Sequence, residues 1–285
     1  MKKVGILYIC TGDYNLFWED FYKSFQEKFL NNCELHYYVF TDAKKIYDEE
    51  NNKNIHRKSV VNLPWPLITH FRFRTFLSIE DELKNMDYLL FSNANMVCSD
   101  IITEEEFLPR ENKGEELFVT VHPGYANMKC RHVPYDRNKK SYAYIPYNQG
   151  NVYVIGAMNG GTSKAFLEMA RTLNEAIEED LKKNVIARWH DESHLNRYIV
   201  DRKDYRLLSS EYCYPYGMNV NYQRKISAVS KMEKFDVNKF KGVYKKTKKE
   251  STLNKLAILK QWVKEDVWFI GDKLLFKKVK KYGFK

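Results

Sequence analysis

The most reactive segment of the sequence is Trp189-His190-Asp191-Glu192-Ser193-His194-Leu195-Asn196, which gathers two carboxylates, two imidazoles, an indole and an amide. Side chains of this kind carry out acid–base chemistry, bind metals and stabilise charged intermediates. A surface helix start or a packed core requires far fewer of them. We therefore expect a ligand to be bound or transformed here. Spacing alone does not choose between a metal site, a carboxylate site and a polar helix cap.

The metal interpretation depends on His190 and His194, which have the i, i+4 spacing by which a helix presents two zinc ligands. In the HExxH motif the general base is the glutamate directly after the first histidine. Here Asp191 occupies that place, Glu192 follows it, and the sequence offers no evident downstream ligand. A zinc hydrolase therefore stays the weaker alternative.

The carboxylate interpretation requires only that Glu192 face a centre that becomes positively charged. Glycosyl transfer passes through such an oxocarbenium-like state, which a carboxylate stabilises or traps covalently. Asp191 and the imidazoles would then hold sugar hydroxyls. This interpretation needs a nucleotide site nearby.

Three apolar runs that each end in polar residues indicate where the polypeptide could build that site. They are Val4 to Cys10 before Thr11-Gly12-Asp13, Leu35 to Phe40 before Thr41-Asp42, and Tyr88 to Phe91 before Ser92-Asn93-Ala94-Asn95. Helix-like stretches such as Leu16 to Phe29 separate them, which predicts an α/β fold with a mostly parallel sheet and helices on both faces. Ligands bind at the carboxyl ends of such strands. We therefore expect Thr11, Tyr14, Asn93 and Asn95 to share one rim.

Three further segments bear on this rim. Arg72 follows the break at Pro64-Trp65-Pro66 and would lean over the rim, unless its helix is an exposed one with surface arginines. Gly156 to Gly161 reads as a turn whose backbone could approach a ligand closely. Lys164 to Lys183 has the pattern of an amphipathic helix, with Ser163 as its N-cap.

The third strand ends in Asn93-Ala94-Asn95, where many nucleotide-sugar enzymes place Asp-x-Asp to hold a divalent ion on the diphosphate. Neutral amides are poor ligands for a hard dication, which prefers carboxylates. We therefore expect no metal and no other cofactor. Cationic side chains would neutralise the diphosphate instead, and the candidates are Arg72, Arg74 and Lys231.

The net charge of +10 is concentrated in a basic tail. Residues 239–285 hold 15 Lys and four acidic residues, a balance of +11, so residues 1–238 carry −1. The tail has apolar residues at helical spacing from Leu253, which predicts a basic amphipathic helix that lies on an anionic membrane or docks on the protein's own body. Because the excess charge lies outside the domain with the motifs, nucleic acid is not the expected partner. A binding protein that is targeted by this tail is a third alternative.

The five Cys residues are widely spaced and form no CxxC pair, so neither a disulfide framework nor a structural zinc site is indicated. No segment reaches the roughly 18 apolar residues that span a bilayer. We expect a cytoplasmic protein, whose tail either contacts the inner face of the membrane peripherally or docks on the protein's own body.

The reactive segment, extended through Arg197-Tyr198, resembles the family 6 glycosyltransferases, which include the blood-group A and B transferases and the α-1,3-galactosyltransferases. The resemblance runs from about Gly5 to Lys234. Its other segments are Tyr37 to Asp42, His122-Pro123-Gly124, Ala143 to Pro146, Gln149-Gly150, Gly160-Gly161, Ser209 and Glu211-Tyr212.

The resemblance implies a GT-A fold: a Rossmann-like sheet with an abutting acceptor lobe, over 1–238, with a nucleotide half at about 1–100 and an acceptor and catalytic half at about 101–238. It implies retaining transfer of Gal or GalNAc from UDP to the 3-hydroxyl of a β-galactoside, often a fucosylated one. Glu192 matches the catalytic carboxylate. The matched donor contacts are Ile9, Thr11, Tyr14, Arg72, Asn93, Asn95, Ile155, Gly156, Ala157, His190, Asp191 and Lys231. The matched acceptor contacts are His122, Gln149 and Trp189.

Two departures refine the expectation. Asn-x-Asn is similar to bacterial members that work without metal, and Tyr214-Pro215 stands where the vertebrate enzymes have Trp and an acidic residue. Donor choice in vertebrate members follows the positions of Ile155 and Ala157, where Leu and Gly go with GalNAc and Met and Ala go with Gal. In this sequence Ile155 and Ala157 therefore give one feature that points to each donor. We favour GalNAc, with Gal as the alternative.

Overall fold

The computed structural model describes residues 1–219 and 221–235, and it confirms the α/β architecture. Within these residues the main sheet has the strand order β3-β2-β1-β4-β7-β6-β8. All neighbouring pairs are parallel except the two that involve β7. The strands are β1 (Lys3–Ile9), β2 (Glu34–Thr41), β3 (Ile55–Ser59), β4 (Tyr88–Ser92), β6 (Leu117–Val121), β7 (Val154–Thr162) and β8 (Tyr205–Leu208). A separate antiparallel pair is formed by β5 (Met96–Cys98) and β9 (Ile226–Ala228). The basic tail beyond 238 and its predicted helix lie outside the described residues.

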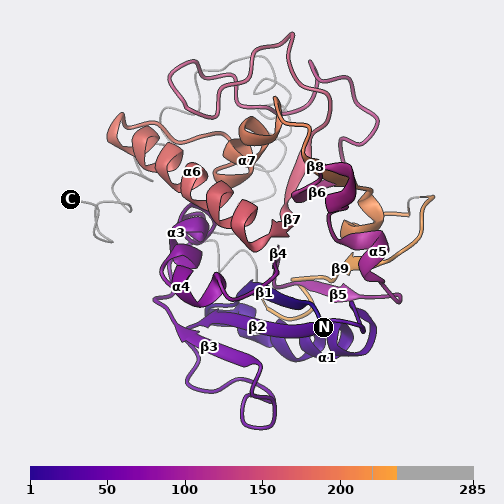
Figure 1. The fold of residues 1–285 in the computed structure, drawn as a ribbon. Helices are drawn as coiled ribbons and strands as arrows, with labels where there is room; N and C mark the ends of the chain where they lie inside the picture. The colour runs from indigo at the N-terminus through magenta and orange to yellow at the C-terminus, as the bar shows by residue number, and fades with distance from the viewer. Residues whose placement is uncertain (220, 236–285) are drawn as a thin grey trace, which may run out of the picture.

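Helices cover both faces of the sheet (Figure 1). The helical elements are η1 (Gly12–Phe17), α1 (Trp18–Lys28), α2 (Leu67–His70), α3 (Arg72–Leu77), α4 (Glu80–Leu83), α5 (Glu104–Phe107), η2 (Glu111–Lys113), α6 (Ser163–Lys182), α7 (Asp191–Ile199) and η3 (Ser210–Cys213). On one face α1 buries Trp18, Phe21 and Phe25 against β1. On the other face α3, α6 and α7 share a second apolar core that includes Phe76, Phe166 and Leu195. In the part of the chain that is described, no helix is long and apolar enough to cross a membrane.

The long amphipathic helix is confirmed as α6, but its N-cap is Thr162 and not Ser163. The Thr162 hydroxyl accepts a hydrogen bond from the backbone N–H of Ala165 (3.3 Å). The Ser163 hydroxyl instead donates to the carbonyl oxygen of Leu83 (2.8 Å), because the residue is buried against α4. The first predicted helix is also divided in two, since a 3-10 turn precedes α1.

The glycine-rich turn that we predicted at 156–161 is wrong, because these residues lie within β7. The glycines allow neighbouring strands to approach: a Cβ on Gly160 would lie 2.4 Å from the Leu89 carbonyl oxygen, and one on Gly161 would lie 2.5 Å from that of Glu116. Any larger residue would push β4 or β6 away. The glycines in the sequence do not show by themselves whether they form a turn or allow strands to pack closely.

Residues 122–153 connect β6 to β7 without helix or strand, and Figure 1 shows them as loops beyond the ends of these strands. They enclose a small apolar cluster of their own, formed by Val133, Tyr135, Ile145 and Tyr153. This segment carries two of the three predicted acceptor contacts, His122 and Gln149.

Candidate active site

The predicted rim forms where the carboxyl ends of β1 and β4 meet the beginning of β7. Ile9 is the last residue of β1, and η1 after it carries Tyr14. Beside it, the backbone N–H of Asn93, directly after β4, donates to the carbonyl oxygen of Ala157 on β7 (2.9 Å). The predicted donor positions Ile155, Gly156 and Ala157 therefore lie next to the end of β4. The parallel strands β1 and β4 end at this edge of the sheet, and the antiparallel strand β7 begins there, so segments that are distant in the sequence meet.

Glu192 lies in the first turn of α7, and both of its carboxylate oxygens are held. One oxygen accepts from the Tyr153 hydroxyl (2.7 Å) and the other from the backbone N–H of Gly156 (2.8 Å). A Cβ on Gly156 would lie 3.2 Å from the Cβ of Glu192, so glycine permits this close approach. Burial raises the pKa of Glu192 to about 7, although the bonds from Gly156 and Tyr153 oppose the rise. The carboxylate is thus fixed in position and poised to change charge near neutrality.

Arg72 and Asp191 form a buried ion pair beside Glu192. Their nearest N and O atoms are 2.7 Å apart, and the two side chains are 7% and 6% exposed. The Arg72 guanidinium also donates to the carbonyl oxygen of Gly156 (2.7 Å) and lies 3.9 Å from the centre of the Phe91 ring. Burial raises the pKa of Asp191 to about 6 and lowers that of Arg72. Arg72 therefore lies at the rim, and the alternative of an exposed arginine is wrong for it. Arg74 is exposed, on the opposite side of α3.

Three histidines gather in this region: His70 and His194 are buried, and the half-buried His190 has its ring centre 6.0 Å from that of His70. The pKa values of His70 and His194 are lowered to about 3, and that of His190 to about 4, mainly by burial, so all three rings are neutral. No hydrogen bond within the described residues reaches either nitrogen of His70 or His194, and the Nε2 of His194 lies 3.4 Å from an Asp180 oxygen. Among residues 1–219 and 221–235, no three His, Cys, Asp or Glu side chains are arranged to hold a metal ion. The zinc alternative gains no support from this geometry.

His190 precedes α7 with backbone angles of φ 53° and ψ −126°. A non-glycine residue seldom adopts such angles, and the cost is on the order of 1–3 kcal/mol. The sharp turn places the Asp191 carboxylate against Arg72 while Glu192, the next residue, faces β7. Strain of this kind is typical of a functional segment.

On the predicted acceptor side, His122 and Trp189 lie near Glu192, but Gln149 does not. The ring centre of His122 is 5.7 Å from that of Tyr153, whose hydroxyl holds Glu192. The Nδ1 of His122 accepts from the N–H of Gly124 (3.0 Å), and burial lowers the pKa of the ring to about 4. The neutral ring therefore carries its proton on Nε2, which can donate to a hydroxyl.

The other two predicted acceptor contacts differ in placement. Trp189, three residues before Glu192, is 42% exposed and offers an aromatic face to a ligand. The Gln149 amide donates to Asp201, beyond the carboxyl end of α7, whereas Glu192 is at the opposite end of this helix.

The two asparagines after β4 are placed differently. The Asn93 side chain is half-buried and makes no hydrogen bond with the described residues. Asn95 is 7% exposed, and its side-chain nitrogen donates to the carbonyl oxygen of Val229 (3.0 Å). Lys231 lies near the rim, with its Nζ 5.3 Å from the centre of the Tyr14 ring. The amide of Asn95 is thus directed at the polypeptide and not at the rim.

Comparison with known proteins agrees with this geometry. The profile of glycosyltransferase family 6 matches residues 2–258. The chain belongs to glycosyltransferase family 6. The fold is accordingly the GT-A-like fold that the resemblance predicted, and the enzyme is a glycosyltransferase.

Among similar proteins, the O-antigen biosynthesis glycosyltransferase WbnI of Escherichia coli is 37% identical over 223 residues, which cover 78% of this chain and 92% of that protein. Globoside alpha-1,3-N-acetylgalactosaminyltransferase 1 of Gallus gallus is 31% identical over 215 residues, covering 73% of this chain and 61% of its own. Histo-blood group ABO system transferase 2 of Rattus norvegicus is 28% identical over 228 residues, covering 73% and 62%. The chain thus spans less than two thirds of these two vertebrate relatives.

Sequence reasoning missed two residues of this family 6 site. Tyr153 holds Glu192, and His70 belongs to the group of three histidines. In the sequence, Tyr153 could have been linked to the site only because it stands two residues before Ile155. His70 could have been linked to it only because it stands two residues before Arg72.

Proposed function

We propose that this enzyme is a retaining transferase that moves GalNAc from UDP-GalNAc to a β-galactoside in α-1,3 linkage. The preferred acceptor is a fucosylated β-galactoside, and no divalent metal is required. The observation that carries the proposal is Glu192, buried at the rim and held by Tyr153 and Gly156 beside the Arg72–Asp191 pair. A rigid carboxylate at this point can stabilise or trap the anomeric carbon as the diphosphate leaves. The names of the two vertebrate relatives are consistent with this class of reaction.

In this proposal the leaving diphosphate takes the proton from the acceptor hydroxyl, so that no separate general base is required. Asp191 and His190 hold the donor sugar, and Thr11, Tyr14 and Ile9 hold the uridine. His122 and Trp189 contact the acceptor. Amides at Asn93 and Asn95 supply no charge to a dication, and the positive charge of Arg72 is largely balanced by Asp191. We assign Lys231 to the diphosphate, because its Nζ lies 5.3 Å from the ring centre of Tyr14 at the proposed uridine site.

The choice of GalNAc over Gal depends on the space beside Ile155 and Ala157. Ile155 is the feature that favours GalNAc, because its branched aliphatic side chain is similar to the Leu that goes with GalNAc in vertebrate members. Ala157, buried at the junction with Asn93, matches the residue that goes with Gal and supports the alternative. We expect the enzyme to transfer GalNAc faster than Gal to a fucosylated galactoside. Product mass and linkage analysis of parallel reactions with the two UDP-sugars tests this. Faster transfer from UDP-Gal would replace the donor assignment with the alternative, and a β-linked product would refute retention.

The pH dependence of transfer should report the Glu192 carboxylate. The group must be ionised to stabilise positive charge, and burial raises its pKa to about 7, so kcat/KM should fall about tenfold per unit as the pH drops below 7. The groups that act on it are Asp191, which raises its pKa, and Arg72, Gly156 and Tyr153, which lower it, while Cys213 from η3 is also close.

Tyr153→Phe removes a hydrogen bond that favours the ionised carboxylate, so the acid limb of this pH profile should move to higher pH. The matched control is Tyr125→Phe, since the Tyr125 ring packs on Tyr153 with centres 5.2 Å apart but its hydroxyl does not bond Glu192. The account predicts a shift for the first variant alone. An unchanged limb in Tyr153→Phe would contradict it.

A further inference from the structure

The strand pair β5–β9 ends at a double contact between Asn95 and Val229. The backbone N–H of Val229 donates to the carbonyl oxygen of Asn95 (2.8 Å). In return the side-chain nitrogen of Asn95 donates to the carbonyl oxygen of Val229 (3.0 Å), which is the bond that a backbone N–H would supply in a longer ladder. Because Asn95 is 7% exposed, this exchange is shielded from water.

The chain that leaves this contact crosses the rim. Two residues after Val229, the Nζ of Lys231 lies 5.3 Å from the ring centre of Tyr14. Phe235 then packs on the same Tyr14, with ring centres 5.1 Å apart, and Lys234 donates to Asp20 of α1 (2.8 Å). The Asn95 side chain therefore contacts the chain just before the segment that carries Lys231 beside η1.

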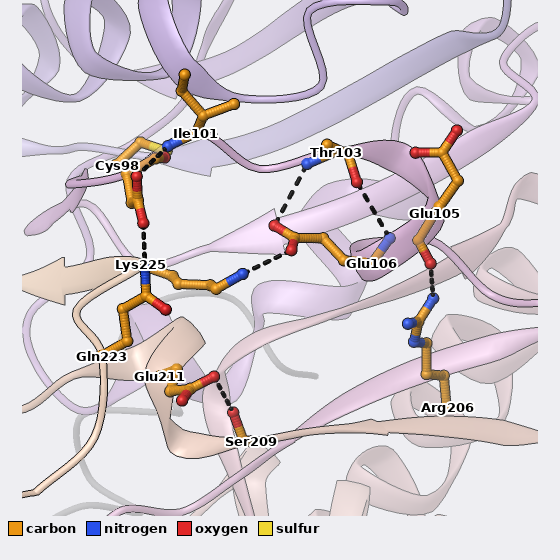
Figure 2. Close-up of polar contacts among 11 residues, drawn as sticks. Cys98, Ile101, Thr103, Glu105, Glu106, Arg206, Ser209, Glu211, Gln223 and Lys225 are labelled. Atoms are coloured by element: carbon orange, nitrogen blue, oxygen red, sulfur yellow. Dashed lines mark hydrogen bonds and ion pairs between the residues drawn. The ribbon is translucent and has the colours of Figure 1, made fainter.

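The other end of the segment is fastened independently (Figure 2). Lys225 donates to Glu106 of α5 (2.6 Å), and Gln223 donates to Asp100. Next to them the hydroxyls of Ser99 and Ser227 are 2.9 Å apart. The pair β5–β9 would thus persist without the Asn95 side chain, whose bond acts on the chain at Val229, two residues before Lys231.

We propose that Asn95 is a positioning residue, whose side-chain amide fixes the backbone at Val229 and thereby holds Lys231 where a nucleoside diphosphate binds. This inference rests on the proposed function, in which Lys231 meets the diphosphate. An aspartate could not take this role, because a carboxylate has no proton to donate and would face the Val229 carbonyl oxygen at about hydrogen-bond distance. The second amide of Asn-x-Asn therefore does more than remove a charge: it supplies the donor that orders the replacement cation.

A double-mutant cycle on UDP affinity, measured calorimetrically in EDTA, tests the proposal. Asn95→Leu removes the donor without adding charge, and Lys231→Met removes the cation without shortening the side chain. Each single change should weaken UDP binding roughly tenfold, and Asn95→Leu should add less than about twofold when Lys231 is already Met, because its effect passes through the lysine. Ser99→Ala, at the other end of the strand pair, should leave the affinity unchanged.

The other outcomes are distinct. Additive effects of the two changes would show that Asn95 acts on the nucleotide without Lys231 and would overturn the proposal, as would unchanged affinity in Lys231→Met. Failure of the unaltered enzyme to bind UDP would instead refute the proposed function. If Asn95→Leu does not fold, Asn95→Ser is used in the same cycle, because its hydroxyl is too short to reach the same carbonyl.

Discussion

Glu192→Gln is expected to lower the transfer rate roughly 10³-fold while leaving the affinity for UDP-GalNAc unchanged. A neutral amide cannot balance the charge of the anomeric carbon. The fold should survive, because the Gln oxygen can accept from the Gly156 N–H while its nitrogen donates to the Tyr153 hydroxyl. Steady-state kinetics and a binding titration on the same preparation separate the two effects.

The matched control for this variant is Glu168→Gln, the same change at an exposed carboxylate on α6. It should transfer sugar at the unaltered rate. Near-normal turnover in Glu192→Gln would remove Glu192 from the catalytic role, and equal losses in both variants would show that the effect is not specific to the site.

Arg72→Met is expected to lower the free energy of unfolding by about 3–5 kcal/mol, because it leaves the buried Asp191 carboxylate without its partner. The same change leaves the Gly156 carbonyl without its Arg72 donor. Urea unfolding monitored by tryptophan fluorescence measures the loss. A second change, Asp191→Leu, should recover part of the stability by removing the stranded charge.

Arg74→Met is the control for this prediction, since Arg74 is exposed on the same short helix, where an interaction contributes at most about 1 kcal/mol to stability. Equal stability of Arg72→Met and the unaltered protein would mean that the buried pair contributes nothing. Further destabilisation by Asp191→Leu in the Arg72→Met background would contradict the stranded-charge explanation.

The sequence predicted those parts of the site that local patterns determine. Apolar runs that stop at polar residues placed Thr11, Tyr14, Asn93 and Asn95 at one sheet edge, because parallel strands must end together. The structure turns the Asn95 amide away from that edge, to the carbonyl oxygen of Val229. The family resemblance of the reactive motif implied the catalytic role of Glu192, which stays a prediction. Helical spacing gave the length of α6 to within one residue at each end.

The contacts that hold the site were not predictable in this way. These contacts are hydrogen bonds between residues far apart in the sequence. Tyr153 and Glu192 are separated by 39 positions, Arg72 and Gly156 by 84, and Asn95 and Val229 by 134. Each pairing follows from sheet order and packing, which no local pattern encodes. For the same reason the sequence predicts a turn or a close backbone approach to a ligand at Gly156 to Gly161, since the close approach of neighbouring strands that requires glycine is visible only in three dimensions.

We propose that this site transfers sugar without a divalent metal, with Lys231 as the cation at the diphosphate. The most direct test is the initial rate of GalNAc transfer from UDP-GalNAc to a fucosylated galactoside, measured after exhaustive chelation with EDTA and again after Mn²⁺ is supplied in excess. We expect the two rates to agree within about twofold, since Asn93 and Asn95 offer a dication no charge. Transfer that is abolished by EDTA and restored by Mn²⁺ would contradict it.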